Sequence, residues 1–320
     1  MVIWIAFLAL VFFFLALDLG VFNKSPHVVS TREALMWTSI WVTVSLLFSV
    51  FVYFAYENHW EGIGLTIGEA HTGKEAVLKY LTGYLIEQSL SVDNIFVIAV
   101  IFNYFRIPPQ YQHRVLFWGI IGALVFRGIM IAVGVVLISR FSWISYVFGA
   151  ILLYSAYKML SADHEGVNPE KNRLVQWFKK FFPVVNRMEG EHFFIRKMGV
   201  KAATPLFVAL LVVETTDVMF AFDSIPAIFA ITTDPFLVFT SNIFAILGLR
   251  SLYFVLASFL GKFRYLQYSL VAILGFVGIK MILLNHVHFP EWSSLVVIVA
   301  LLGVGVLASL AVPERRDVGS

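Results

Sequence analysis

Apolar residues form long runs along almost the whole chain, and short polar stretches separate them. About nine of these runs have the length, roughly 20 residues, that a helix needs to cross a hydrocarbon layer about 30 Å thick. They lie near 2–22, 34–56, 77–104, 114–138, 143–160, 203–231, 236–260, 265–284 and 290–311. The pattern therefore predicts an all-α polytopic membrane protein with about nine transmembrane helices.

Composition supports the same fold class. Of the 320 residues, 60% are hydrophobic and 13% are charged, with a mean hydropathy of +0.85, which lies outside the range of soluble globular chains. The implied partner is the lipid bilayer. The net charge of +3 resides in the loops, so no nucleic-acid partner is expected. The chain has no cysteine, which excludes disulfides and thiolate metal sites. The oligomeric state stays open.

The distribution of Lys and Arg predicts an orientation. Basic connections alternate with neutral or acidic ones, and the longest basic connection covers about 161–200, whereas 57–75 is mostly acidic. By the positive-inside rule, the N-terminus lies outside, and the C-terminus and the loop 161–200 lie in the cytoplasm. The first run has no basic flank before it and no small-residue cleavage site after it, so it is expected to be a retained helix.

The chain contains an internal repeat that includes its rarest membrane residues. Residues 85–101 align with the segment around 223, and 146–160 align with 268–282. The matched polar positions pair Glu87 with Asp217, Asp93 with Asp223, Asn94 with Ser224, and Arg127 with Arg250. These matches predict a first unit over about 77–160 and a second over about 203–284. Each unit has three helices, so the two have opposite orientations, as in secondary transporters whose site lies at the repeat interface.

Five carboxylates fall inside the predicted spans, namely Glu87, Asp93, Glu214, Asp217 and Asp223. A charged residue at a helix centre costs about 2.5 to 3.5 kcal/mol, so something must compensate these charges. Pairing with Arg127 and Arg250 would neutralise only two acids. A structural polar network and a path for protons or monovalent ions stay open, but clustered acids favour a divalent cation site. Asn94, Thr215 and Ser224 are expected to add oxygen atoms.

Proline chemistry predicts that the acidic helices are interrupted. Pro226 removes a backbone hydrogen bond, and Asp223-Ser224 before it has the composition of a helix N-cap, so we expect a break near 218–224. The segment 91–94 is the corresponding candidate in the first unit. Lys158 and Lys280, at the ends of equivalent helices, are expected to reach the membrane interface.

The ligand types restrict the metal. All eight histidines lie in or beside predicted loops, which leaves oxygen as the ligand inside the membrane. Oxygen sites suit Mg²⁺, Ca²⁺ or Mn²⁺ better than zinc, copper or nickel. The three hard ions remain alternatives at this level.

One connection has a mixed character. The segment 172–185 combines aromatic residues with Lys and Arg. It is expected either to lie on the inner membrane surface or to form a solvated loop.

Several long stretches resemble one known family. GYLIEQSLSVDNIFV (83–97), EHFFIRKMG (191–199), LDLGVF (17–22) and the acidic segment 212–254 are similar to the TerC family of bacterial inner-membrane proteins, in particular its Alx-like branch. The resemblance covers almost the whole chain. It implies a fold related to the LysE transporter superfamily, location in the inner membrane, and export of manganese. It also implies that the five carboxylates form the metal path.

These observations lead to a functional expectation. The chain is expected to be a secondary-active transporter that exports Mn²⁺ from the cytoplasm. It is expected to exchange the metal for protons, which displace it from the carboxylates. The alternative is a membrane assembly factor that helps to insert or metallate exported proteins, with the basic loop as its partner surface. An enzyme is not expected, because the chain has no GxGD sequence and no phosphate-binding glycine loop.

Overall fold

The computed structural model describes most of the chain. The described residues are 2–17, 28–65, 70–161, 173–181, 183–185, 190–197, 200–257, 265–284, 286–287 and 289–311. The long helices are α1 (Val2–Leu17), α2 (Thr31–Glu57), α3 (Gly73–Tyr104), α4 (Pro109–Arg140), α5 (Ile144–Ser161), α7 (Pro205–Phe229), α8 (Pro235–Ala257), α9 (Leu266–Leu283) and α10 (Glu291–Ala311). The smaller elements are a 3₁₀ turn (Trp60–Gly62), α6 (Arg173–Phe181), β1 (Phe194–Lys197) and β2 (Val200–Ala203).

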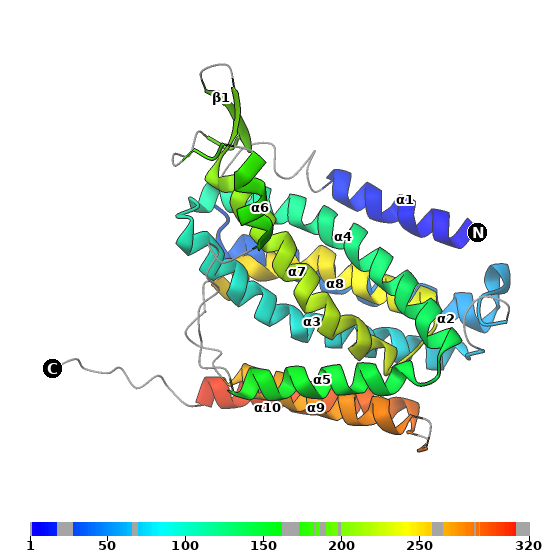
Figure 1. Ribbon diagram of the computed structural model, residues 1–320. Helices are drawn as coiled ribbons and strands as arrows, with labels where there is room; N and C mark the ends of the chain where they lie inside the picture. The colour runs from blue at the N-terminus through cyan, green and yellow to red at the C-terminus, as the bar shows by residue number, and fades with distance from the viewer. Residues whose placement is uncertain are drawn as a thin grey trace.

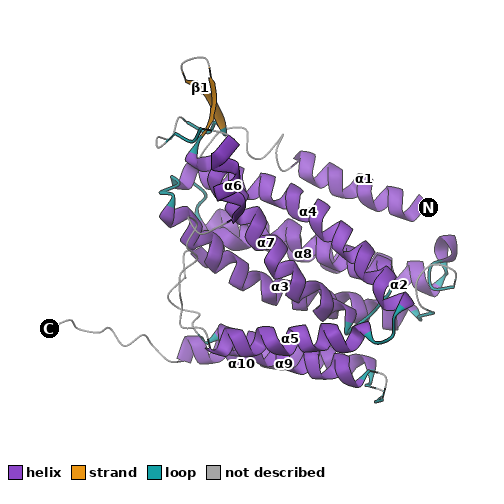
Figure 2. Ribbon diagram, in the orientation of Figure 1, coloured by secondary structure: helices purple, strands orange, loops and turns teal. Residues whose placement is uncertain are grey.

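The helices confirm a polytopic membrane protein of about nine spans. Within the described residues, eight helices, α2 to α5 and α7 to α10, are long and apolar enough to cross a membrane. Helix α1 adds 16 apolar residues. Its predicted extension to residue 22 lies outside the described residues. Figure 2 shows that the described regular structure is helical except for one hairpin.

The helices form a central group with a further group on each side (Figure 1). Helices α3, α4, α7 and α8 lie in the centre, α1 lies at one edge, and α5, α9 and α10 form a row at the other edge. Within that row α5 and α9 are in very close contact at Gly149 and Gly278. A Cβ atom at Gly149 would lie 2.9 Å from the carbonyl oxygen of Gly278, so only glycine permits this approach.

The central helices pack in a crossed pattern. Helix α3 packs along α8, and α4 packs along α7, while α3 also contacts α7 and α4 also contacts α8. Figure 1 shows α3 and α7 running in opposite directions. If α3 corresponds to α7 and α4 to α8, as the predicted units require, the pair α3–α8 corresponds to the pair α7–α4, so the contacts have the symmetry that two repeats would give. The repeat itself stays a prediction.

The predicted basic loop contains regular structure in its described part. Helix α6 packs against α7, where the rings of Phe178 and Phe207 lie 5.1 Å apart, and Trp177 is exposed. Strands β1 and β2 pair in antiparallel register from Phe194 with Ala203 to Lys197 with Val200. Whether α6 lies on the membrane surface or in water stays a prediction.

The predicted helix interruptions are wrong. Helix α7 continues through Pro226 to Phe229, and α3 continues through 91–94. Pro226 lies in the last turn of α7, so its missing N–H removes only one hydrogen bond close to the point where the helix ends. A continuous α7 directs Asp217 and Asp223 to different sides, because six residues rotate by about 600°, which is about 120° short of two full turns.

One of the two lysine expectations is also wrong. Lys158 is exposed, but Lys280 is 7% exposed and its Nζ donates a hydrogen bond of 2.8 Å to the Ser294 hydroxyl on α10. Helix α10 covers the face of α9 that carries Lys280 and supplies an acceptor there. The lysine therefore has no need to reach the interface.

Candidate ion site

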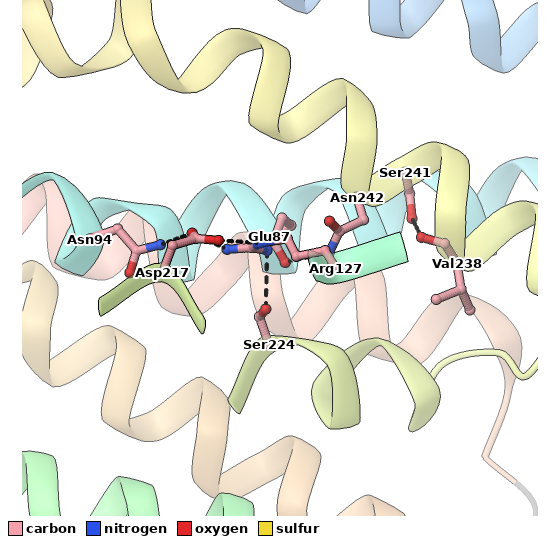
Figure 3. Close-up of polar contacts among 8 residues, drawn as sticks. All are labelled: Glu87, Asn94, Arg127, Asp217, Ser224, Val238, Ser241 and Asn242. Atoms are coloured by element: carbon pink, nitrogen blue, oxygen red, sulfur yellow. Dashed lines mark hydrogen bonds and ion pairs between the residues drawn. The ribbon is translucent and has the colours of Figure 1, made fainter. Parts of the chain in front are cut away.

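Arg127 lies at the centre of a buried polar network between α3, α4, α7 and α8 (Figure 3). Its side chain is 1% exposed. Nη2 donates to Asp217 Oδ1 at 2.8 Å and Nε donates to Asp217 Oδ2 at 3.2 Å, which is a two-point pairing. Nη1 donates to the Glu87 carboxylate and, at 3.3 Å, to the Ser224 hydroxyl. One guanidinium therefore serves two carboxylates on different helices.

Two asparagines complete the hydrogen bonds of these carboxylates. Asn242 Nδ2 donates to Glu87 Oε2 at 2.9 Å, and Asn94 Nδ2 donates to Asp217 Oδ1 at 3.4 Å. Both asparagines are buried, at 0% and 4% exposure, and neither Oδ1 atom has a hydrogen-bond partner among the described residues. The side-chain carbonyl oxygens of both asparagines are thus buried beside the carboxylates, and neither oxygen accepts a hydrogen bond from the described part of the chain. Buried polar atoms without a partner are rare in folded proteins.

Asn242 is the residue that sequence reasoning missed. It lies in α8, in the apolar stretch FTSNIFAILGLR. A carboxamide in the middle of such a span is as uncommon as the acids that were singled out, so residue type was an available signal. When Arg127 is aligned with Arg250, Asn242 aligns with Gly119. The other positions were identified because a polar residue occurs in both repeats, and at this position only one repeat has a polar residue.

The network explains how two of the five acids are buried. An ionised carboxylate inside a membrane protein requires a partner, and truncation of one member of a buried ion pair typically costs 3–5 kcal/mol. Glu87 is fully buried and Asp217 is 9% exposed. Arg127 supplies one positive charge for two carboxylates, so the ionised triad carries a net charge of −1.

Glu214 takes a separate place on α7. Its carboxyl group lies directly against Gly122 of α4, where a Cβ atom would overlap it. The Oε2 atom is buried and has no hydrogen-bond partner in the described part of the chain. The Glu214 carboxyl group can therefore take this position only because residue 122 has no side chain.

Asp223 faces a different helix. The Ser155 hydroxyl of α5 donates to Asp223 Oδ1 at 2.6 Å, and Lys158 on the same helix is close enough to interact electrostatically. Asp223 thus connects α7 to the row of α5, α9 and α10. Among the described residues, the hydrogen bonds of Arg127 go to Glu87, Asp217 and Ser224, and none goes to Asp223.

The remaining predicted positions differ in their surroundings. Asp93 is partly buried on α3. The Thr215 hydroxyl donates a hydrogen bond of 2.7 Å to the Leu211 carbonyl of its own helix, so its hydroxyl hydrogen already has an acceptor. Arg250 borders a small cavity of about 20 Å³ together with Asn94 and Asp217, large enough for about one water molecule.

The five acids are not assembled into one cluster. Within the ranges that the structure describes, no three His, Asp or Glu residues lie close enough together to hold a metal ion. Continuous helix α7 places Glu214, Asp217 and Asp223 against different partners, and Arg127 lies between Glu87 and Asp217. The role of the five acids as metal ligands stays a prediction.

Comparison with known proteins gives a consistent set of relatives. A family model described as "Integral membrane protein TerC family" matches residues 72–317. A protein of Myxococcus xanthus named "Uncharacterized membrane protein STKORF319" is 49% identical over 308 residues, which are 96% of this chain and 92% of the relative. Proteins of Escherichia coli K12 and Salmonella typhi named "Putative membrane-bound redox modulator Alx" are 44% and 43% identical over 316 residues, 98% of this chain and 96% of each relative. No solved structure matches the chain.

Proposed function

The chain belongs to the integral membrane protein TerC family, and from this premise we propose that it is a secondary-active transporter that exports Mn²⁺ from the cytoplasm. It works in the bacterial inner membrane, with its N-terminus outside and its C-terminus in the cytoplasm, as its loop charges favour. Protons from outside replace the metal. Mg²⁺ and Ca²⁺ are the competing substrates that oxygen ligands also suit.

The observation that carries the proposal is the set of oxygen atoms around Arg127. Glu87 and Asp217 present carboxylate oxygens, and Asn94 and Asn242 add two buried carbonyl oxygens that lack donors. Carboxylates and carbonyls are the ligands that hard divalent cations take. In the state described here the cation among them is the Arg127 guanidinium, so it holds the place of the substrate.

Charge balance favours a divalent ion. Two ionised carboxylates carry −2, so a divalent cation in place of the guanidinium makes the pair neutral, whereas a monovalent cation leaves one uncompensated charge. Neutrality matters because an unpaired charge in the membrane interior costs several kcal/mol. Selection between divalent and monovalent ions therefore follows from the number of carboxylates.

The same balance gives a coupling rule. When the metal leaves, Arg127 returns and supplies one of the two positive charges that were lost. A single proton on Glu87 or Asp217 then restores neutrality, because a neutral carboxyl needs no counter-ion. Exchange at this pair is consequently one proton for one metal ion, with any further protons bound elsewhere.

The decisive experiment is ⁵⁴Mn²⁺ flux in proteoliposomes under an imposed pH gradient. The expected result is gradient-dependent flux that Mg²⁺ or Ca²⁺ reduces only in excess, and its loss in Asp217→Asn. Glu33→Gln, a carboxylate at the exposed start of α2, is the matched control and keeps the flux. Absence of flux from folded wild-type protein, or full flux in Asp217→Asn, overturns the proposal.

A further inference from the structure

Helix α6 has one face toward α7 and one face outward. Val175 and Phe178, three residues apart, lie on the side that packs with the start of α7, and Val175 is 1% exposed. Trp177 and Lys180, also three residues apart, lie on the opposite side, and both are exposed, Trp177 at 62%. The outward face of this short helix therefore combines a large apolar ring with a cation.

The contact with α7 fixes the depth of α6 and of the hairpin. The ring of Phe207 lies 5.1 Å from the ring of Phe178 on α6 and 4.4 Å from the ring of Phe194 on β1. Phe207 is the third residue of α7, about 3 Å from the start of the helix. Because α7 has 25 residues, it is about 37 Å long and exceeds a hydrocarbon layer about 30 Å thick. Its first turn, with α6 and the hairpin, therefore lies at the level of the lipid headgroups.

Exposed tyrosines mark the same level on other helices. Tyr104 is the last residue of α3 and is 47% exposed, and Tyr268 is the third residue of α9 and is 61% exposed. Figure 1 shows α3 ending and α9 beginning at the end of the molecule where α7 begins. Trp and Tyr are enriched at the headgroup level because their rings are apolar and carry a polar group. Trp177 thus belongs to an aromatic belt at this end.

The hairpin places two cations opposite each other. Arg196 of β1 pairs with Lys201 of β2 in the antiparallel register, so both side chains lie on one face, and both are exposed. Like charges directly opposite each other destabilise a sheet. Among the described residues neither forms an ion pair, whereas Arg114 is paired with Glu191 at 2.8 Å. An anion from outside the chain that lies between Arg196 and Lys201 would relieve their repulsion.

We propose that α6 and the hairpin form a binding surface for anionic phospholipids, with a lipid phosphate between Arg196 and Lys201. The surface consists of Trp177, Lys180, Phe194, Arg196 and Lys201, and we call it the basic-aromatic surface. Its rings enter the headgroup layer, and its cations contact phosphate oxygens. The inference concerns the bilayer and does not depend on which ion the protein transports.

A lipid fits this surface better than a soluble partner. Lipid phosphates are concentrated at the level of the surface, and each Lys or Arg near an anionic membrane strengthens binding about fivefold. A short helix with basic residues on one side and an aromatic ring beside them is typical of elements that lie in the interface. An acidic soluble protein supplies the charge but no apolar layer for Trp177. Since α7 also carries Asp217, a lipid bound at its start holds the helix of the candidate site at one depth.

The test measures quenching of Trp177 fluorescence by brominated lipids. Purified full-length protein is reconstituted into phosphatidylcholine vesicles that contain an increasing fraction of either brominated phosphatidylglycerol, which is anionic, or brominated phosphatidylcholine, which is zwitterionic. The same titrations are made with Trp177→Phe, which keeps an aromatic ring. The difference between the two proteins isolates Trp177 among the eight tryptophans of the chain.

The expected result is a preference of Trp177 for the anionic lipid that depends on the hairpin. Arg196→Gln reduces the preference about fivefold, and further addition of Lys201→Gln reduces it about fivefold again. Arg140→Gln removes an exposed charge from the last residue of α4, at the opposite end of that helix from Arg114. This matched control keeps the preference.

Three other outcomes overturn the proposal. Equal quenching by the two lipids means that the surface lies on the bilayer without selecting anionic headgroups. Absence of quenching by either lipid means that Trp177 faces water, which leaves the surface to a soluble partner. An equal loss in Arg140→Gln and Arg196→Gln means that the preference follows from net charge alone. None of these measurements involves Mn²⁺ flux, so their failure leaves the proposed function untouched.

Discussion

The surroundings of Arg127 and Arg250 differ although the aligned sequence around them is similar. Arg127 is almost fully buried and contacts two carboxylates and a hydroxyl, whereas Arg250 is partly buried and borders a cavity beside one of the same carboxylates. Nearby, Asn242 stands on one side and Gly119 on the other. The difference teaches that a sequence repeat identifies which residues correspond, while the size of their neighbours decides which of them meet.

The largest expected effect is the loss of Arg127. In Arg127→Met, Glu87 and Asp217 stay buried without a cation, and the variant is expected to lose about 3–5 kcal/mol of unfolding free energy. Arg250→Met, at the partly buried counterpart, is expected to lose less than half as much. Thermal unfolding in detergent measures both. Equal losses would remove the contrast between the two arginines.

A smaller effect is expected on the face of α4 that holds Glu214. Gly122→Ala places a methyl group where the Glu214 carboxyl lies, and overpacking of this kind typically costs about 1–3 kcal/mol. Gly128→Ala, whose Cβ atom meets Phe239 at 3.4 Å, is the control on the same helix and is expected to be nearly neutral.

The double variant Gly122→Ala with Glu214→Ala tests the cause of that loss. Removal of the carboxyl group makes room for the methyl group, so stability is expected to recover most of the cost of Gly122→Ala. If the two losses simply add, the contact between Gly122 and Glu214 does not determine this packing.

The two asparagines allow a finer comparison. Asn242→Ala removes a hydrogen bond of 2.9 Å to the fully buried Glu87 and is expected to cost about 1.5–3 kcal/mol. Asn94→Ala removes a bond of 3.4 Å to Asp217 and is expected to cost less, at about 1 kcal/mol. The same unfolding measurement ranks them. A reversed order would mean that Asp217 depends on its carboxamide more than Glu87 does.

The smallest effect is expected at Gly119. Gly119→Ala adds one methyl group next to the cavity at an ordinary contact distance, and alanine favours a helix over glycine by up to about 1 kcal/mol. The variant is therefore expected to be slightly more stable, with a melting temperature a few degrees higher. A lower melting temperature would show that the space at Gly119 must stay empty in the folded state.

Much of the fold was predictable because lipid imposes a simple rule on sequence. Long apolar runs identified the spans, since a helix is the only way for a short segment to satisfy its backbone in hydrocarbon. Rare polar residues identified Glu87, Arg127 and Asp217 for the same reason. Regular structure in the basic loop gave no comparable signal, because α6 and the hairpin are short and lie outside the spans.

The parts that failed depend on contacts between distant segments. Whether Pro226 breaks a helix depends on its distance from the helix end, which the composition of the stretch did not reveal. Lys280 can be buried because the Ser294 hydroxyl of another helix accepts a hydrogen bond from its Nζ. The sharing of one guanidinium by two acids, and the role of Asn242, also depend on which helices cross, and periodicity along one chain carries no such information.

The close contact between α5 and α9 has a consequence for biosynthesis. Helix α9 begins at Leu266, about 120 residues after Ile144, so at 5–20 residues per second it emerges from the ribosome roughly 6 to 24 s after α5. During that interval the glycine surface at Gly149 lacks its later partner on α9. The nascent chain must therefore hold α5 in the bilayer through its short connection to α4, and completion of the row is a late step in maturation.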